Sequence, residues 1–342
     1  MSADLKQTQL ADWRQRALGF EREVGKAVIG LDQPIRHILI AVFARGHVML
    51  EGDVGVGKTT LLRAVARCLG GAYERVEGTI DLMPNDLVYH TYINEFGKPQ
   101  VDPGPVLKHG EDLSVFFFNE VNRARPQVHS LLLRIMAEHA VSAFNREHFF
   151  PYLQVFADRN RVEKEETFEI PSAARDRFMM ELHIETPADP ALRRALMFDP
   201  KFHDVDRLLD TLTPGLLPYR EIPQIAPVIQ QSVAASETLQ QYALDLWEAT
   251  RRPAGYGVKL DGIDMDRLIL AGASARGVSM MMRAARVAAW LDGREFVVPE
   301  DIHGVFRETI AHRVFFNPVY ELRRTALIDE LLDAIRQRVA AP

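Results

Sequence analysis

The chain has 342 residues, a formal net charge of -6, and 47% hydrophobic and 26% charged residues. This balance is typical of a globular protein and excludes a disordered, collagenous or low-complexity chain. The single cysteine, Cys68, excludes a disulfide framework and a cysteine-rich zinc site. The acidic balance argues against a strongly basic nucleic-acid binder. The polar N-terminus and the short apolar runs predict no secretory signal and no membrane span, so we expect a cytoplasmic protein of about two domains.

Three kinds of pattern follow one another along the chain. Apolar residues at three- and four-residue spacing within 1–28 predict a helix that docks on the core: Leu10, Trp13, Ala17, Phe20 and Val24. From Val48 to Ile184, short apolar runs alternate with helical patterns, which predicts an α/β fold with a parallel sheet and helices on both faces. The predicted strands are 47–51, 73–77, 114–118, 153–157 and 179–184.

The remaining segments predict the domain limits. Glycine and proline mark 92–106, and a turn-like Asn145-Arg146 marks 141–152, so both are expected to be protruding hairpins or loops. We expect an N-terminal helical segment over 1–30, an αβα core over 31–187, and a proline-rich connector with one short helix over 188–225. The rest, 226–342, is predicted to be helical, with its strongest segments at 242–252, 265–272, 278–291 and 320–339 and a helix start at Pro299.

The segment from Gly52 to Thr59 reads Gly-Asp-Val-Gly-Val-Gly-Lys-Thr and fits the phosphate-binding pattern G-x-x-x-x-G-K-[ST]. Glycines let the backbone wrap phosphates, and the following helix presents its N–H groups and positive dipole. Lys58 would reach the β- and γ-phosphates, and Thr59 would place its hydroxyl on Mg²⁺. The alternative is a glycine-rich turn with a solvated lysine. The predicted nucleotide site comprises Gly52, Asp53, Val54, Gly55, Val56, Gly57, Lys58, Thr59 and Thr60.

A second motif has the Walker B form, in which an apolar strand ends in acidic residues. The run 115–118 is followed by Asn119 and Glu120. The usual first residue is an aspartate that holds hydrated Mg²⁺. Asn119 can still accept a hydrogen bond from a magnesium-bound water, but it cannot contribute charge. Glu120 can still polarise the attacking water. We therefore predict hydrolysis, and a nucleotide-binding protein with weak hydrolysis is the alternative.

Further polar residues at strand ends indicate which class of nucleotide enzyme this is. The absence of an Asn-Lys-x-Asp signature argues against a GTPase. Asn160 follows the strand 153–157, where it could hold the water opposite Glu120. Arg177 stands just before the last core strand and suits a finger that reaches a neighbour's γ-phosphate, with Arg175 as the competing candidate. Such a finger can contribute about 10³–10⁵ in rate.

These motifs resemble the MoxR-type AAA+ ATPases, from about Val28 to Arg313. The resemblance rests on the residues that lead into the P-loop (46–52), on 81–86, on the Walker B run with its Asn-Arg-Ala continuation (119–126), on 176–178, on 249–251 and on Gly-Ala-Ser-Ala-Arg at 272–276. It implies a five-stranded αβα core with two inserted hairpins, a helical lid, and a homo-oligomeric ring that is usually hexameric. It also implies ATP and Mg²⁺ as cofactors.

The resemblance assigns roles to individual residues. Lys58 and Thr59 match Walker A, and Glu120 matches the catalytic Walker B glutamate. Asn160 matches sensor 1, Arg177 the arginine finger and Arg276 sensor 2. The expected nucleotide contacts therefore include Asn119 and Arg276, and the expected magnesium contacts are Thr59 and, through water, Asn119.

Members of the family act as ATP-driven chaperones. They commonly work with proteins that carry a von Willebrand factor A domain, often to insert metal or mature an enzyme complex. This sequence resembles the branch linked to methanol dehydrogenase maturation. A nucleotide-dependent scaffold with negligible turnover, and a nucleic-acid or chelatase-type motor, are the alternatives.

Two departures from the family pattern stand out. Walker B carries Asn119, and the sensor 1 stretch reads Ala-Asp-Arg-Asn-Arg where the family usually has Ala-Thr-Gln-Asn-Pro. Asp158 and Arg159 therefore add charge near the nucleotide. They could couple the site to a neighbouring subunit, or compensate for the charge lost at position 119.

Overall fold

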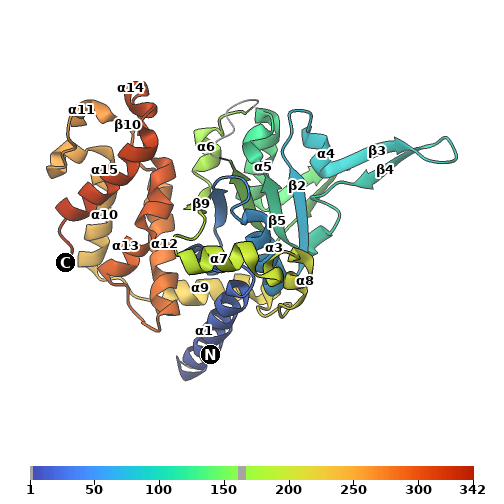
Figure 1. Ribbon diagram of the computed structural model, residues 1–342, viewed down its shortest axis with the longest axis horizontal. Helices are drawn as coiled ribbons and strands as arrows, with labels where there is room; N and C mark the ends of the chain where they lie inside the picture. Colours follow the sequence, from blue (N-terminus) through green and yellow to red (C-terminus); the bar gives the residue numbers. More distant parts are fainter. Residues whose placement is uncertain (1–2, 161–166) are drawn as a thin grey trace. The chain divides into compact units, whose positions relative to one another are not determined.

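The computed structural model describes residues 3–160 and 167–342. They divide into two compact units. The sheet unit contains residues 15–177 and 182–225, and the helical unit contains residues 3–14, 178–181 and 226–342. Figure 1 labels many of the elements of both units.

The centre of the fold is a five-stranded sheet with the strand order β2-β5-β8-β1-β9. The pairs β2–β5, β5–β8 and β8–β1 are parallel. Every residue of β5 is buried, as expected for a strand covered by helices on both faces. The predicted parallel α/β fold is confirmed, because each apolar run became a strand with nearly the predicted limits: β1 (His47–Glu51), β2 (Ala72–Glu77), β5 (Leu113–Asn119), β8 (Gln154–Arg159) and β9 (Phe178–His183).

Helices precede and connect these strands. Ala17, Phe20 and Val24 of α1 are fully buried, in agreement with the predicted docking face. The longest apolar run of the chain lies in α2, whose residues from His37 to Phe43 are all buried. The helices up to the end of the sheet are α1 (Ala3–Gly25), α2 (Asp32–Phe43), α3 (Lys58–Leu69), α4 (Pro84–Val88), α5 (Pro126–Glu138) and α6 (Ser172–Arg175).

Cys68 lies on the buried face of α3 and has no exposed surface. Burial raises the pKa of its thiol to about 12, because a thiolate is poorly solvated there. At about pH 8 this lowers the thiolate fraction roughly a thousandfold relative to an ordinary thiol. We expect iodoacetamide to leave Cys68 unmodified in the native protein and to label it fully in denaturant, as read by intact mass. Rapid labelling without denaturant would contradict this packing.

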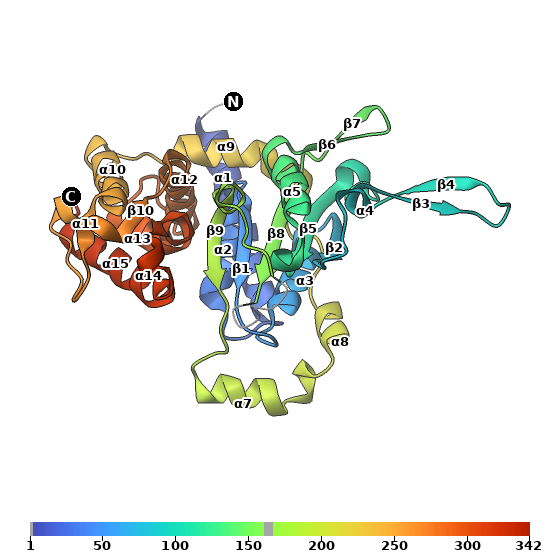
Figure 2. The ribbon, with the colours of Figure 1, turned by 90° about the horizontal axis from the view of Figure 1, so that it is seen from above.

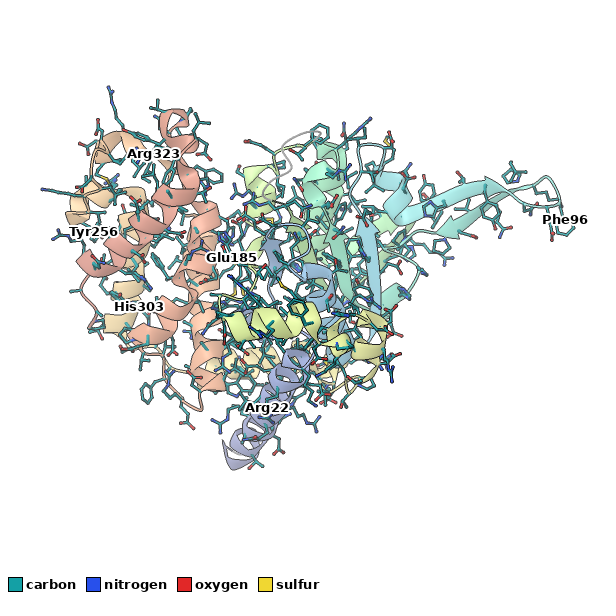
Figure 3. All side chains as sticks on the ribbon, viewed as in Figure 1. Arg22, Phe96, Glu185, Tyr256, His303 and Arg323 are labelled. Carbon is teal, nitrogen blue, oxygen red and sulfur yellow. The ribbon has the colours of Figure 1, made fainter. Side chains whose placement is uncertain are left out.

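Antiparallel hairpins occupy both stretches that interrupt the strand–helix alternation. The first pairs β3 (Tyr89–Ile93) with β4 (Pro99–Pro103), and Figures 1 and 2 show it projecting from the sheet unit. Phe96 lies in its end loop and is 77% exposed (Figure 3). The second pairs β6 (Ala140–Ala143) with β7 (Arg146–Phe149). Its turn is Phe144-Asn145, one residue earlier than predicted, because Arg146 already pairs with Ala143.

The stretch 188–225 holds two helices, α7 (Pro190–Phe198) and α8 (Val205–Asp210), where the sequence predicted one. Pro190 stands at the start of α7, where its missing N–H costs nothing. Asp189 and Asp204 cap the two helices by accepting backbone N–H bonds. The prolines therefore begin helices here instead of preventing them. The next helix, α9 (Ile222–Ser232), already starts inside this stretch.

The C-terminal region is helical, as predicted, apart from one small antiparallel sheet. The predicted helix 265–272 ends at Leu268, because Ile269 pairs with Phe316 of a distant strand. The predicted helix 320–339 is interrupted at Leu322, whereas the predicted start at Pro299 is confirmed. The elements are α10 (Glu237–Arg251), α11 (Met265–Leu268), β10 (Ile269–Ala271), α12 (Ala275–Leu291), α13 (Pro299–Ile310), β11 (Phe315–Phe316), α14 (Pro318–Glu321) and α15 (Arg324–Arg338).

Side chains tie these helices together. The Tyr242 hydroxyl of α10 lies 2.6 Å from Nε2 of His303 on α13, a residue labelled in Figure 3. Arg307 of α13 donates to Asp329 of α15 at 2.7 Å. Among the described residues, no helix is long and apolar enough to span a membrane.

Candidate active site

The loop between β1 and α3 requires glycine at two positions, Gly52 and Gly57. Gly57 caps α3 with φ 92°, in the left-handed region that residues with a Cβ avoid. A Cβ on Gly52 would lie 2.3 Å from the carbonyl oxygen of Ile184. The loop therefore turns sharply into the N-terminus of α3, where free N–H groups point outward and favour an anion.

A pocket of about 370 Å³ opens at this loop, at the carboxyl edge of the sheet. It brings together most of the predicted nucleotide and catalytic residues. Gly52 does not line it, but the Gly52 carbonyl accepts a hydrogen bond from Lys58 Nζ at 2.6 Å. The lining residues are Asp53, Val54, Gly55, Val56, Gly57, Lys58, Thr59, Thr60, Arg75, Glu77, Asn119, Glu120, Asp158 and Asn160.

Asn160 connects the cation of the pocket with its central carboxylate. Its Oδ1 accepts from Lys58 Nζ at 2.6 Å, and its Nδ2 donates to Glu120 Oε1 at 3.2 Å. The second oxygen of Glu120 accepts from Arg123 Nη1 at 2.9 Å. Lys58 is 7% exposed, so its charge is held inside the pocket. The Asn160 amide therefore stands between the Lys58 ammonium, which can bind phosphate, and the Glu120 carboxylate, which can orient a water molecule.

Asp158, whose role the sequence left open, contacts the backbone of Glu120. Its Oδ1 accepts from the Glu120 N–H at 2.6 Å, and its Oδ2 lies 3.6 Å from Lys58 Nζ. Burial raises the pKa of this carboxyl, whose side chain is 2% exposed. Glu120 has φ 51°, a strained value for a residue with a side chain. The hydrogen bond that the Glu120 N–H donates to Asp158 helps to hold Glu120 in that conformation.

Arg159, the second unusual residue of this stretch, belongs to a different cluster. Its Nη2 lies 3.1 Å from Glu51 Oε1 at the end of β1. The other oxygen of Glu51 lies 2.7 Å from His183 Nε2. Arg159 is thus paired with an acid beside the pocket and does not line it.

Two residues that the sequence analysis did not single out also line the pocket. Glu77 is the last residue of β2, and its Oε1 accepts from Asn119 Nδ2 at 2.7 Å. Its Oε2 accepts from Arg75 Nη2 at 2.9 Å. The sequence could have indicated Glu77, because ligands of parallel sheets bind at the carboxyl ends of strands and Glu77 ends the predicted strand 73–77.

The three remaining candidate arginines do not line the pocket. Arg177 is half-buried in the turn before β9, where its Nη1 donates to the Ala173 carbonyl at 2.8 Å, and it does not line the pocket. Arg175 ends α6 and is also half-buried. Arg276 is exposed in the first turn of α12, in the helical unit. Their roles as finger and sensor 2 stay predictions.

Comparison with known proteins identifies relatives along the whole chain. Residues 47–180 match the profile of the ATPase family associated with various cellular activities (AAA), and residues 265–332 match an AAA lid domain. Protein MoxR of Methylorubrum extorquens is 63% identical, over 97% of both chains. Chaperone MoxR1 of Mycobacterium tuberculosis is 30% identical, over 94% of this chain and 81% of its own length. A solved protein of Cytophaga hutchinsonii, 30% identical, superposes with a TM-score of 0.84 over all of both chains.

Proposed function

Because the chain belongs to the MoxR family of AAA ATPases, we propose that it hydrolyses ATP at the P-loop pocket and uses the energy to remodel or mature a partner protein. The name of the mycobacterial relative, a chaperone, supports this role. The observation that carries the proposal is the arrangement of Lys58, Asn160 and Glu120 around one pocket at the N-terminus of α3.

Each group has a defined task in this proposal. The N–H groups of the loop and Lys58 bind the phosphates, and Glu120 orients the attacking water and accepts its proton. Asn160 fixes the position of that water opposite Glu120. The pocket also suits Mg²⁺, because its hydroxyl and carboxylate oxygens are the donors that this ion prefers: Thr59, Glu77, Glu120 and Asp158. When bound, Mg²⁺ would neutralise phosphate charge, with Thr59 as its protein ligand.

The proposal extends to assembly and partners. Arg177 would act on the nucleotide of a neighbouring copy, which requires an oligomer, and we propose a hexameric ring in the cytoplasm. Arg276 would add charge from the helical unit. The partner would be a protein with a von Willebrand factor A domain, and the client a methanol dehydrogenase system. The resemblance to that branch of the family and the 63% identity to Protein MoxR support these assignments.

A nucleotide switch with negligible turnover is the second candidate. It is favoured by one observation, the uncharged Asn119 at the position where Walker B usually provides an aspartate. In this version the nucleotide would only drive assembly. The two candidates share the nucleotide site and differ in whether phosphate is released.

Replacing Lys58 with methionine tests the site that both candidates require. Methionine keeps the aliphatic stem and removes the charge-assisted bonds to phosphate, so we expect nucleotide affinity to fall about 10–100-fold. Fluorescence titration with a labelled ADP measures this. Lys98→Ala, in the exposed end of the first hairpin, is the control and should bind as the wild type does. Equal affinity of Lys58→Met and wild type would place the nucleotide elsewhere.

A further inference from the structure

Two carboxylates stand on either side of Asn119 at the carboxyl edge of the sheet. Glu77 is the register partner of Asn119 across the β2–β5 pair. On the other side, Phe118 pairs with Ala157 across β5–β8, so Asp158 follows at the level of Asn119. Residues at the same level of neighbouring parallel strands lie on the same face. The charge that Walker B lacks is therefore present on both adjoining strands.

The contacts of Asp158 give it another task. One of its oxygens accepts from the Glu120 N–H, and the other faces Lys58. The side chain is only 2% exposed. Asp158 is therefore occupied inside the protein, where it holds the Glu120 backbone in position and pairs with the Lys58 ammonium.

Glu77, by contrast, is presented to the pocket. Its side chain is 53% exposed, and Asn119 Nδ2 and Arg75 Nη2 each donate to a different oxygen, at 2.7 and 2.9 Å. Arg75 in turn lies over the Phe117 ring, with its guanidinium carbon 5.8 Å from the centroid. Each carboxylate oxygen has a further lone pair, so Glu77 can accept from another donor while it keeps both bonds.

We propose that Glu77 supplies the carboxylate for the hydrated Mg²⁺ of the bound nucleotide, and that Asn119 acts as its positioning residue. This inference rests on the proposed function and names a further residue of the same site. The carboxylate stands at the end of β2, one strand away from the Walker B position at the end of β5 and at the same level. The amide of Asn119, which cannot carry charge, donates the hydrogen bond that orients the carboxylate.

The Mg²⁺ dependence of nucleotide binding tests this without relying on turnover. Labelled ADP is titrated in EDTA and then at increasing Mg²⁺. Glu77→Gln keeps an acceptor for Asn119 and removes the charge, so the Mg²⁺ midpoint should rise about 10–100-fold while binding in EDTA stays at the wild-type level. Glu74→Gln is the matched control on the same strand, because Glu74 pairs with Lys108 and His109 and does not line the pocket.

A double variant separates a magnesium role from a structural one. Glu77→Gln combined with Asn119→Asp returns the carboxylate to β5 and reverses the hydrogen bond, with glutamine now donating to aspartate. We expect its Mg²⁺ midpoint to return close to the wild-type value. A purely structural defect at Glu77 would not be repaired in this way.

A wild-type Mg²⁺ midpoint in Glu77→Gln would overturn the inference and leave the proposed function standing. A midpoint that rises in Asp158→Asn but not in Glu77→Gln would also overturn it, because the magnesium carboxylate would then belong to β8. Failure of the wild-type protein to bind nucleotide in either buffer would contradict the proposed function itself.

Discussion

Glu120→Gln lowers ATP turnover by about 10²–10⁴-fold, the usual contribution of a positioned general base, and leaves ATP binding unchanged. Glutamine keeps the size of the side chain and one acceptor oxygen, so it can retain the hydrogen bond from Asn160 Nδ2 or the one from Arg123 Nη1, but it loses the other. It cannot accept the proton of the attacking water. Phosphate release at saturating ATP measures the rate, and labelled nucleotide measures the binding.

The hydrogen bond of the Glu120 backbone should keep residue 120 in place in the variant, so the test reports on the side chain. Asp158 accepts from this backbone N–H, and that contact does not depend on the side-chain charge at position 120. Glu147→Gln, an exposed change of the same chemistry on β7, is the control and should turn over as the wild type does. Full turnover by Glu120→Gln would remove Glu120 from the role of base.

Arg177→Ala lowers assembly-dependent turnover by about 10³–10⁵-fold, because an arginine finger stabilises charge that develops on the transferred phosphoryl group. Nucleotide binding by the same chain should be retained, since Arg177 does not line its own pocket. Arg175→Ala is the natural comparison, two residues away and also half-buried. We expect Arg175→Ala to keep most of the turnover.

Mixing variants tests whether the finger acts between copies. In an equimolar mixture, a Glu120→Gln subunit can provide Arg177 to a neighbouring Arg177→Ala subunit whose Glu120 is intact. The mixture should therefore release phosphate faster than either variant alone. A mixture as inactive as its components would show that Arg177 does not act in trans, and normal turnover by Arg177→Ala alone would reject the finger.

The sequence predicted the sheet closely because each strand is a continuous apolar run with polar residues at its ends. It also predicted the P-loop and Glu120, since these follow a strand in fixed order. It did not single out Glu77, because an acidic residue at the end of a strand is, by its pattern alone, most simply explained as a solvated charge. The role of Glu77 follows from its pairing with Asn119 across β2 and β5, and these two residues are far apart in the chain.

Asp158 illustrates the same dependence on pairing. The sequence showed its unusual position beside Asn160, but the bond to the Glu120 backbone exists only because β8 lies next to β5. The predicted helix 265–272 ended early for a related reason. Ile269 finds a partner in Phe316, and this distant pairing outweighs the local helical pattern.

The central claim is that this pocket releases phosphate although Walker B carries Asn119. Its most direct test is the steady-state ATP turnover of the purified wild-type protein in Mg²⁺, recorded together with its mass in the presence and absence of nucleotide. The account predicts turnover that accompanies nucleotide-driven assembly and stops in EDTA. A protein that binds ATP, assembles and releases no phosphate would contradict it, and would make the chain a nucleotide switch.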